Sequence, residues 1–111
     1  MEISTSPLDG ATIISVDGEI DANTAPEAQD RILPLATPGC RLVLNLTNVP
    51  YMSSAGLRIL LATYRQISSG GGKVVLVGVA EEIKDTMSVT GFIRFFKVCD
   101  TIQEGVAALS A

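Results

Sequence analysis

Two stretches rich in β-forming residues open the chain, residues 3–8 and 11–17, and the dipeptide Asp9-Gly10 lies between them. Asp-Gly readily adopts the positive φ angles that a tight turn between antiparallel strands requires. The pattern therefore predicts a β-hairpin at the start of the chain.

Two nearly continuous apolar runs follow, Leu42 to Leu46 and Lys73 to Val79. Uninterrupted apolar runs of this length are typical of strands that are covered on both faces. We expect these runs to be the central strands of a sheet. Phe95 to Val98 is expected to form a further short strand.

Helix signals lie between the predicted strands. Thr24 is expected to be the N-cap of a first helix, with Pro26 in its first turn and Glu27 completing a capping box. Pro34 should end or kink this helix near Leu33, because proline cannot continue the backbone hydrogen bonds of a helix.

A second, amphipathic helix is predicted over residues 54–69, before three consecutive glycines at 70–72. Its inward-facing residues are expected to be Leu57, Leu60, Leu61, Tyr64 and Ile67. A third helix is expected from Glu81 to Thr90, closed by Gly91. Asp100 is the expected N-cap of a last helix, in which the aligned apolar residues are Ile102, Val106 and Leu109.

The order of these elements predicts the fold class. A hairpin followed by alternating strands and helices is typical of an α/β domain with a mostly parallel sheet. The chain has 111 residues, 47% of them hydrophobic, which suits one domain with a sizeable core. We therefore expect a single α/β domain over residues 1–111, with the sheet packed against about four helices.

The composition excludes several kinds of site. The chain has no histidine, which excludes Ser-His-Asp and Cys-His nucleophilic sites and His-based zinc sites made by this chain alone. Its two cysteines, Cys40 and Cys99, cannot close a tetrahedral zinc site without further partners. We expect no metal, no cofactor and no catalytic residue.

Charge and hydropathy exclude two classes of partner. The net charge of −4 disfavours nucleic acid, because phosphate binding needs a basic face. The apolar runs are far shorter than the roughly 20 residues that cross a bilayer, and no secretion signal is visible at the N-terminus. We expect a cytoplasmic protein that binds neither nucleic acid nor membrane.

Charged residues are distributed unevenly along the chain. Residues 1–30 hold seven acids and no Lys or Arg, whereas residues 31–80 hold five bases and no acid. The two blocks either attract each other within the fold or steer a protein partner toward it.

Two serines, Ser53 and Ser54, stand where the predicted central strand leads into the second helix. One of their hydroxyls is expected to cap free backbone amides. A phosphate on Ser54 would carry about −1.5 to −2 charges at the positive end of the helix, where an anion is tolerated. The fold should survive this modification, whereas a partner surface that had desolvated the neutral hydroxyl should not tolerate it.

The side of the second helix opposite the expected inward residues is the predicted docking face. It presents an apolar strip flanked by bases, made of Ala55, Arg58, Ile59, Ala62 and Arg65. Arg58 lies one turn after Ser54, where it could pair with a phosphate. The alternative is that a neighbouring helix of the same chain covers Ile59.

Several motifs in this order carry a family resemblance. They are Gly18-Glu19-Ile20-Asp21 with Thr24-Ala25-Pro26, Leu42-Val43-Leu44-Asn45-Leu46 leading to Val49, Tyr51-Met52-Ser53-Ser54-Ala55-Gly56-Leu57, and Thr90-Gly91-Phe92 with Phe95-Phe96. Together they resemble the bacterial anti-sigma factor antagonists of the STAS domain family, over essentially the whole chain. The resemblance implies that a partner kinase, itself an anti-sigma factor, phosphorylates Ser54, and that phosphorylation ends binding.

This sequence departs from the family pattern at two positions. Ser53 stands where the family usually has an aspartate immediately before the acceptor serine, and Asn45 replaces an aspartate of the central strand. The first change removes a negative charge beside Ser54 and leaves Ser53 as a second candidate acceptor. The second change puts a neutral amide where the family has a charge, and a charge would need partners when buried. This indicates a structural role for Asn45.

The resemblance implies a phosphorylation-controlled binding protein and not an enzyme. The unmodified form would bind an anti-sigma factor that is a GHKL-type serine kinase and relieve inhibition of its target, and a metal-dependent serine phosphatase would reset the switch. Asp21 matches a family position at the partner surface, although local turn capping explains it equally well. With the helix face, the predicted partner-binding residues are Asp21, Thr24, Ser53, Ala55, Gly56, Arg58, Ile59 and Ala62.

Other functions stay open at this stage. A STAS scaffold or small-ligand sensor within a larger signalling assembly would keep the fold and change the role. A small hydrolase with Ser54 as its nucleophile would lack an imidazole base. The chain is expected to be a monomer or a weak dimer.

Overall fold

Residues 1–110, the part of the chain that the computed structural model describes, contain one five-stranded sheet in the order β1-β2-β3-β4-β5. The strands are β1 (Glu2–Leu8), β2 (Ala11–Asp17), β3 (Arg41–Asn48), β4 (Lys73–Val77) and β5 (Lys97–Cys99). β1 and β2 are antiparallel, and the other neighbouring strands are parallel. The predicted α/β fold with a mostly parallel sheet is confirmed.

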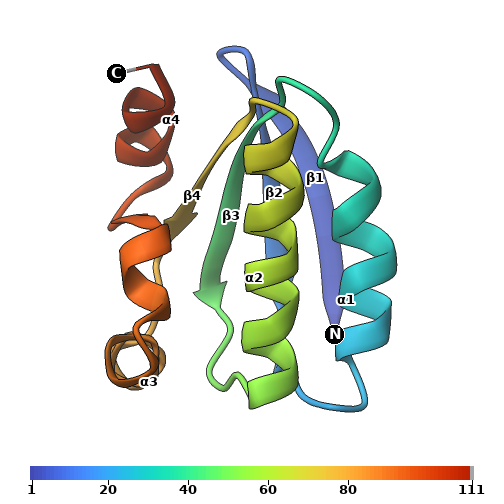
Figure 1. Cartoon of the computed structure of the whole chain (residues 1–111), viewed down its shortest axis with the longest axis vertical. Helices are drawn as coiled ribbons and strands as arrows, with labels where there is room; N and C mark the ends of the chain where they lie inside the picture. Colours follow the sequence, from blue (N-terminus) through green and yellow to red (C-terminus); the bar gives the residue numbers. More distant parts are fainter. Residues whose placement is uncertain (111) are drawn as a thin grey trace.

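Helices cover both faces of this sheet. They are α1 (Ala25–Ile32), α2 (Ser54–Ser69), α3 (Glu81–Thr90) and α4 (Ile102–Ser110), with short 3₁₀ helices η1 (Leu33–Leu35) and η2 (Phe92–Phe95). Figure 1 shows α1 and α2 side by side in front of β1, β2 and β3. None of the helices formed by residues 1–110 has the length and apolar content needed to cross a bilayer.

The core has two parts, one on each face of the sheet. On the larger side, fully buried Ile14, Leu44 and Leu76 pack against α1, α2 and α3. On the other side, Val106 and Leu109 of α4 pack with buried residues of β2, β3 and β4. The strands are therefore apolar on both faces where helices cover both, which explains the continuous apolar runs in the sequence.

The N-terminal hairpin has the predicted turn. Asp9 and Gly10 both have positive φ angles, 50° and 82°, as a two-residue hairpin turn of type I′ requires. The register places Leu8 opposite Ala11, directly beside the turn.

The arginines of the basic block are not held by direct ion pairs in the part of the chain that the structure describes. Within residues 1–110, the four arginines of the basic block, Arg31, Arg41, Arg58 and Arg65, form no ion pair with an acid. Arg31 instead donates to the carbonyl oxygen of Ile3 at 2.8 Å. No carboxylate of residues 1–110 therefore neutralises these four guanidinium charges by direct contact.

Thr24 is the N-cap of α1 as predicted, but it has helical backbone angles and its side chain makes no capping bond, so the expected capping box with Glu27 does not form. For α4 the cap is Thr101 and not Asp100. The Thr101 hydroxyl accepts from the backbone N–H of Glu104 at 3.1 Å and donates to the Glu104 carboxylate at 3.0 Å, which is a Thr-x-x-Glu capping pair one residue later than expected.

The strand expected from Phe95 to Val98 begins later. Phe92–Phe95 form the 3₁₀ helix η2, and β5 spans Lys97–Cys99. Gly91 closes α3 in a left-handed conformation, with φ of 80°, as predicted. The backbone turns once more in η2 before it can extend, so the strand is displaced toward the C-terminus.

The expected strand Lys73 to Val79 ends earlier, at Val77, because Gly78 has a φ of 70°.

Substitutions at Thr101 and Asp100 test which of the two residues caps α4. We expect Thr101→Ala to lower the free energy of unfolding by about 1 kcal/mol, the usual cost of losing an N-cap side chain. Urea denaturation measures the loss. Asp100→Ala is the matched control and should change stability by less than about 0.5 kcal/mol, as surface substitutions usually do. Equal losses in the two variants would contradict the assignment.

Candidate functional site

The loops after β2 and β3 are joined to each other at the carboxyl ends of these strands. Ile20 and Met52 form an isolated parallel bridge. The backbone N–H of Ile20 donates to the Tyr51 carbonyl at 3.0 Å, and the N–H of Ser53 donates to the Ile20 carbonyl at 2.9 Å. The segment that contains Asp21 and the start of α2 therefore form one connected surface. No strand-like pattern in the sequence predicts this bridge.

Gly56 lets the first turn of α2 lie directly on this bridge. A Cβ atom at Gly56 would lie 2.5 Å from Cγ of Met52 and 2.9 Å from Cγ2 of Ile20. No larger residue fits there without displacing its neighbours. Gly56 was expected among the residues that contact a partner, but it is buried and its role in this structure is packing.

The two serines differ in environment. Ser53 is half-buried at the N-cap of α2, where its hydroxyl oxygen accepts from the Gly56 N–H at a long 3.4 Å. Ser54 is the first residue of the helix and is exposed. The first turn of α2 contains no acidic residue. One serine therefore caps the helix, as expected, and the other presents a hydroxyl to solvent beside the positive end of the helix dipole.

Asp21 organises the neighbouring turn. Its Oδ1 accepts from the backbone N–H of Asn23 at 2.9 Å and of Thr24 at 3.0 Å. The bond from the Thr24 amide is the main cause that holds the pKa of Asp21 below its ordinary value, and burial opposes it. Thr24 completes the turn, because its hydroxyl donates to the Glu19 carbonyl and accepts from the Asp21 N–H, both at 2.9 Å. The turn-capping explanation of Asp21 is thus confirmed, whereas its contact with a partner stays a prediction.

A shallow hollow of about 270 Å³ lies between α1 and α2. Its lining includes Ala55, Arg58 and Ile59 of the predicted docking face. The expectation that Ile59 is exposed is wrong, since only 8% of its surface is accessible and the adjoining helices α1 and α2 pack there. Arg58 and Arg65 are exposed, and Ala55 and Ala62 are half-buried.

The buried face of α2 is turned toward α1 relative to the prediction. Leu57, Leu60 and Ile67 are buried as expected, but Leu61 and Tyr64 are half-buried. Thr63 takes an inward position instead and is 1% exposed, with its hydroxyl donating to the Ile59 carbonyl at 2.8 Å. The leucine positions alone predict the wrong buried side of α2. A threonine whose hydroxyl bonds within its own helix can be buried in the same way as an apolar residue.

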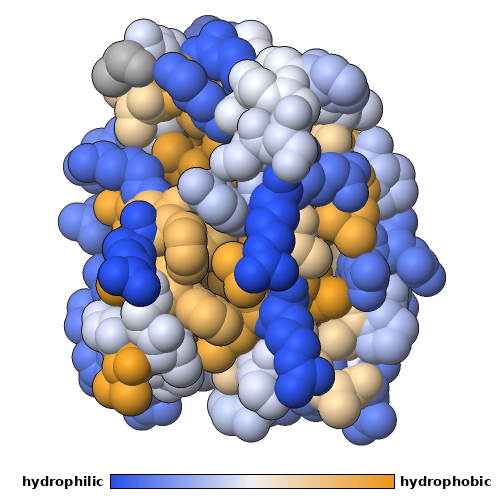
Figure 2. All heavy atoms as spheres, in the orientation of Figure 1, coloured by the Kyte–Doolittle hydropathy of each residue, from blue (hydrophilic) through white to orange (hydrophobic). Residues whose placement is uncertain are grey.

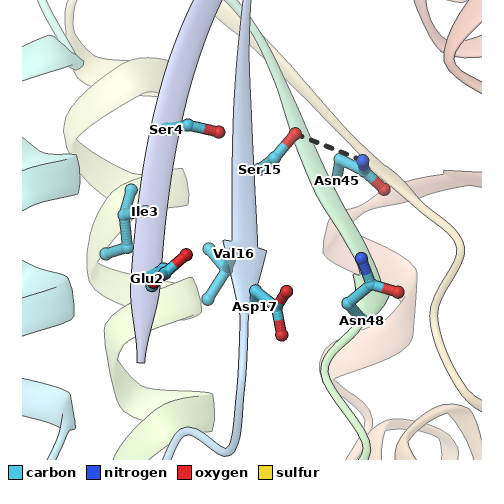
Figure 3. A pocket seen from close by; sticks show the side chains of 8 residues that line it. All are labelled: Glu2, Ile3, Ser4, Ser15, Val16, Asp17, Asn45 and Asn48. Carbon is cyan, nitrogen blue, oxygen red and sulfur yellow. Dashed lines mark hydrogen bonds between the residues drawn. The ribbon is translucent and has the colours of Figure 1, made fainter.

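Asn45 lies beside a second hollow, of about 380 Å³, on the side of the sheet that faces α4. Its amide nitrogen donates to the Ser15 hydroxyl at 3.2 Å, as Figure 3 shows, and its oxygen accepts from the Thr47 N–H at 3.2 Å. The lining comes from β1, β2 and β3, and its polar residues also include Glu2, Ser4, Asp17 and Asn48. These bonds agree with a structural role for Asn45.

Comparisons with known proteins place the chain in a family. The STAS domain matches residues 2–105. The anti-sigma-B factor antagonist of Staphylococcus aureus is 30% identical over 92 residues, which are 82% of this chain and 85% of that protein. The crystal structure of an anti-sigma factor antagonist from Mycobacterium paratuberculosis is 28% identical, with a TM-score of 0.85 over 99% of this chain and 94% of that one.

Two solved structures of lower identity share the fold. The anti-sigma factor antagonist SpoIIAA in its unphosphorylated form has a TM-score of 0.71 at 14% identity, over 99% of each chain. The phosphorylated form of SpoIIAA from Bacillus has a TM-score of 0.73 at 15% identity, over 96% of this chain and 98% of that one. The STAS match spans most of the chain, and the chain therefore belongs to the STAS domain family, among relatives named anti-sigma factor antagonists.

Proposed function

We propose that this protein is a phosphorylation-controlled binding switch. Unmodified, it binds an anti-sigma factor that is also a GHKL-type serine kinase, and it thereby relieves inhibition of that factor's target. Phosphorylation of Ser54 ends binding, and a metal-dependent serine phosphatase restores the unmodified form. The protein acts by binding and carries out no catalysis itself.

The observation that carries this proposal is the difference between the two serines. Ser54 presents an exposed hydroxyl at the first position of α2, whereas the Ser53 hydroxyl is already engaged as the helix cap. A kinase needs an accessible hydroxyl, and a phosphate at the start of a helix is stabilised by free backbone amides and the helix dipole. Arg58, one turn further along α2, is exposed and adds a positive charge.

The surroundings of Ser54 suit a surface that other proteins bind. The bridge between Ile20 and Met52 holds the Asp21 turn beside the start of α2, so both belong to one rigid surface. The names of the relatives support the class of partner, since they describe antagonists of anti-sigma factors. That SpoIIAA has been solved in phosphorylated and unphosphorylated forms supports control by phosphate.

The test is phosphosite mapping by mass spectrometry after incubation with the purified cognate anti-sigma kinase and MgATP. We expect one phosphate on wild-type protein, on Ser54, and none on Ser54→Ala. Ser53→Ala is the matched control and should still be phosphorylated, because its neighbouring hydroxyl is unchanged. Undiminished phosphorylation of Ser54→Ala would contradict the site assignment, and a wild-type protein that the kinase neither binds nor modifies would contradict the proposed function.

A further inference from the structure

The position of Ser54 around α2 shows which neighbouring surface a protein bound at this serine would cover. Residues four, seven and eleven positions after Ser54 lie on nearly the same side of the helix, and these are Arg58, Leu61 and Arg65. Ala55 and Ile59 lie on one flank of this row and, together with Arg58 from the row itself, line the hollow between α1 and α2. The row that begins at Ser54 therefore faces solvent between this hollow on one flank and Tyr64 on the other.

An aromatic patch made of Tyr64, Phe95 and Phe96 lies on the flank of α2 opposite to this hollow. The Tyr64 ring is 5.4 Å from the Phe95 ring and 5.6 Å from the Phe96 ring, measured between centroids. Phe96 is buried, but 41% of the Phe95 surface is exposed. Figure 2 shows an apolar area between α2 and the segment after α3, with strongly hydrophilic side chains on both sides. A large aromatic side chain left this exposed is an interaction anchor of the kind that protein interfaces favour.

The charged residues of the two segments that form the aromatic patch are all positive. Arg65 adjoins Tyr64 on α2, and the Arg94 guanidinium carbon lies 5.9 Å from the centre of the Phe95 ring. Neither α2 nor the segment 91–98 contains an acidic residue. Arg58, Arg65 and Arg94 form no ion pair with an acid within residues 1–110. A surface with one exposed ring and guanidinium groups that no carboxylate of residues 1–110 pairs with is complementary to carboxylates that flank an apolar side chain.

We infer that the partner bound at Ser54 also places an acidic, amphipathic segment on the aromatic patch, with its carboxylates on Arg65 and Arg94. This inference rests on the proposed function and names the chemistry of the partner's second contact. It extends the binding surface along α2 on the side opposite to the hollow at α1. It also gives Arg58 two alternative partners, a carboxylate of the bound protein or the phosphate on Ser54.

The test measures the dissociation constant for the purified cognate anti-sigma kinase without ATP, by calorimetry at low and at high salt. Arg65→Glu and Arg94→Glu should each weaken binding about tenfold at low salt, because close opposite charges become like charges. Phe95→Ala should weaken binding by roughly five- to tenfold, as the loss of an aromatic anchor does. Circular dichroism checks that each variant is folded, and Phe95→Leu replaces Phe95→Ala if that variant is not.

Lys97→Glu is the matched control. It makes the same change of charge at an exposed position beside α4, on the other face of the sheet, and should change affinity by less than about twofold, as distant surface charges do in salt. If Arg65→Glu and Arg94→Glu bind as tightly as wild type while Ser54 phosphorylation still ends binding, this inference is wrong and the proposed function stands. If wild-type protein self-associates and Arg65→Glu is monomeric, a second copy occupies the patch, which also overturns it. If the kinase neither binds nor phosphorylates the wild-type protein, both this inference and the proposed function are wrong.

Discussion

Gly56→Ala is expected to destabilise the protein by about 1–3 kcal/mol, the usual range when an extra methyl group is forced into a packed site. The added Cβ would lie 2.5 Å from Cγ of Met52 and 3.0 Å from the backbone oxygen of Ile20. The side chain of Met52 can move, but the Ile20 carbonyl is fixed, because it accepts from the Ser53 N–H. The steric cost should therefore exceed the gain of up to about 1 kcal/mol that alanine brings to a helix interior.

Urea denaturation with a matched helix control measures this loss. Ser54→Ala introduces alanine in the same helical turn at an exposed position and should change the free energy of unfolding by less than about 0.5 kcal/mol. In a double-mutant cycle, Met52→Ala should recover part of the loss caused by Gly56→Ala, because the closest clashing atom is removed. A Gly56→Ala protein at least as stable as wild type would show that the first turn of α2 does not depend on close contact with the bridge.

The fold could be predicted because its main signals are local. Asp9-Gly10 determines the hairpin turn, and the glycines at 70–72 and 91 end helices where they were expected to. The expectations that failed depend on atoms distant in sequence or on small differences between adjacent residues. Asp100 and Thr101 are both good caps, and only the Glu104 side chain, which pairs with Thr101, decides between them.

The site was predicted less completely, because its geometry comes from tertiary contacts. Ser53 and Ser54 could be located from the sequence, since a strand leading into a helix places them at the sheet edge. The bridge between Ile20 and Met52 and the packing of Gly56 join segments more than 30 residues apart, for which the sequence carries no pairing signal. The prediction that Ile59 lies on the solvent-facing side of α2 is wrong, because α1 covers this residue.

Phosphorylation of Ser54 is expected to weaken binding of the anti-sigma kinase at least about 100-fold, equivalent to about 2.7 kcal/mol. The phosphate brings about −1.5 to −2 charges to a hydroxyl that the bound partner has desolvated. It also competes for Arg58, which is exposed one turn along α2. The phosphate therefore repels acidic groups of the partner and also takes Arg58 away from them. Like charges brought together at an interface cost several kcal/mol. Calorimetry on protein phosphorylated at Ser54 by the kinase, then repurified, measures the loss.

The same phosphate should leave the fold intact, and this separates an electrostatic switch from a conformational one. An anion in the first turn of a helix contributes about 0.3–1 kcal/mol of stability, so phosphorylated protein should unfold at the same or slightly higher urea concentration. Unphosphorylated Ser54→Ala should keep binding within about tenfold of wild type, since the net contribution of a neutral hydrogen bond is about 0.5–1.5 kcal/mol. Phosphorylated protein that binds the kinase as tightly as the unmodified form would contradict the switch. Phosphorylated protein that loses binding together with its near-ultraviolet circular dichroism would instead show that the phosphate acts by disrupting the packing of α2 on the Ile20–Met52 bridge.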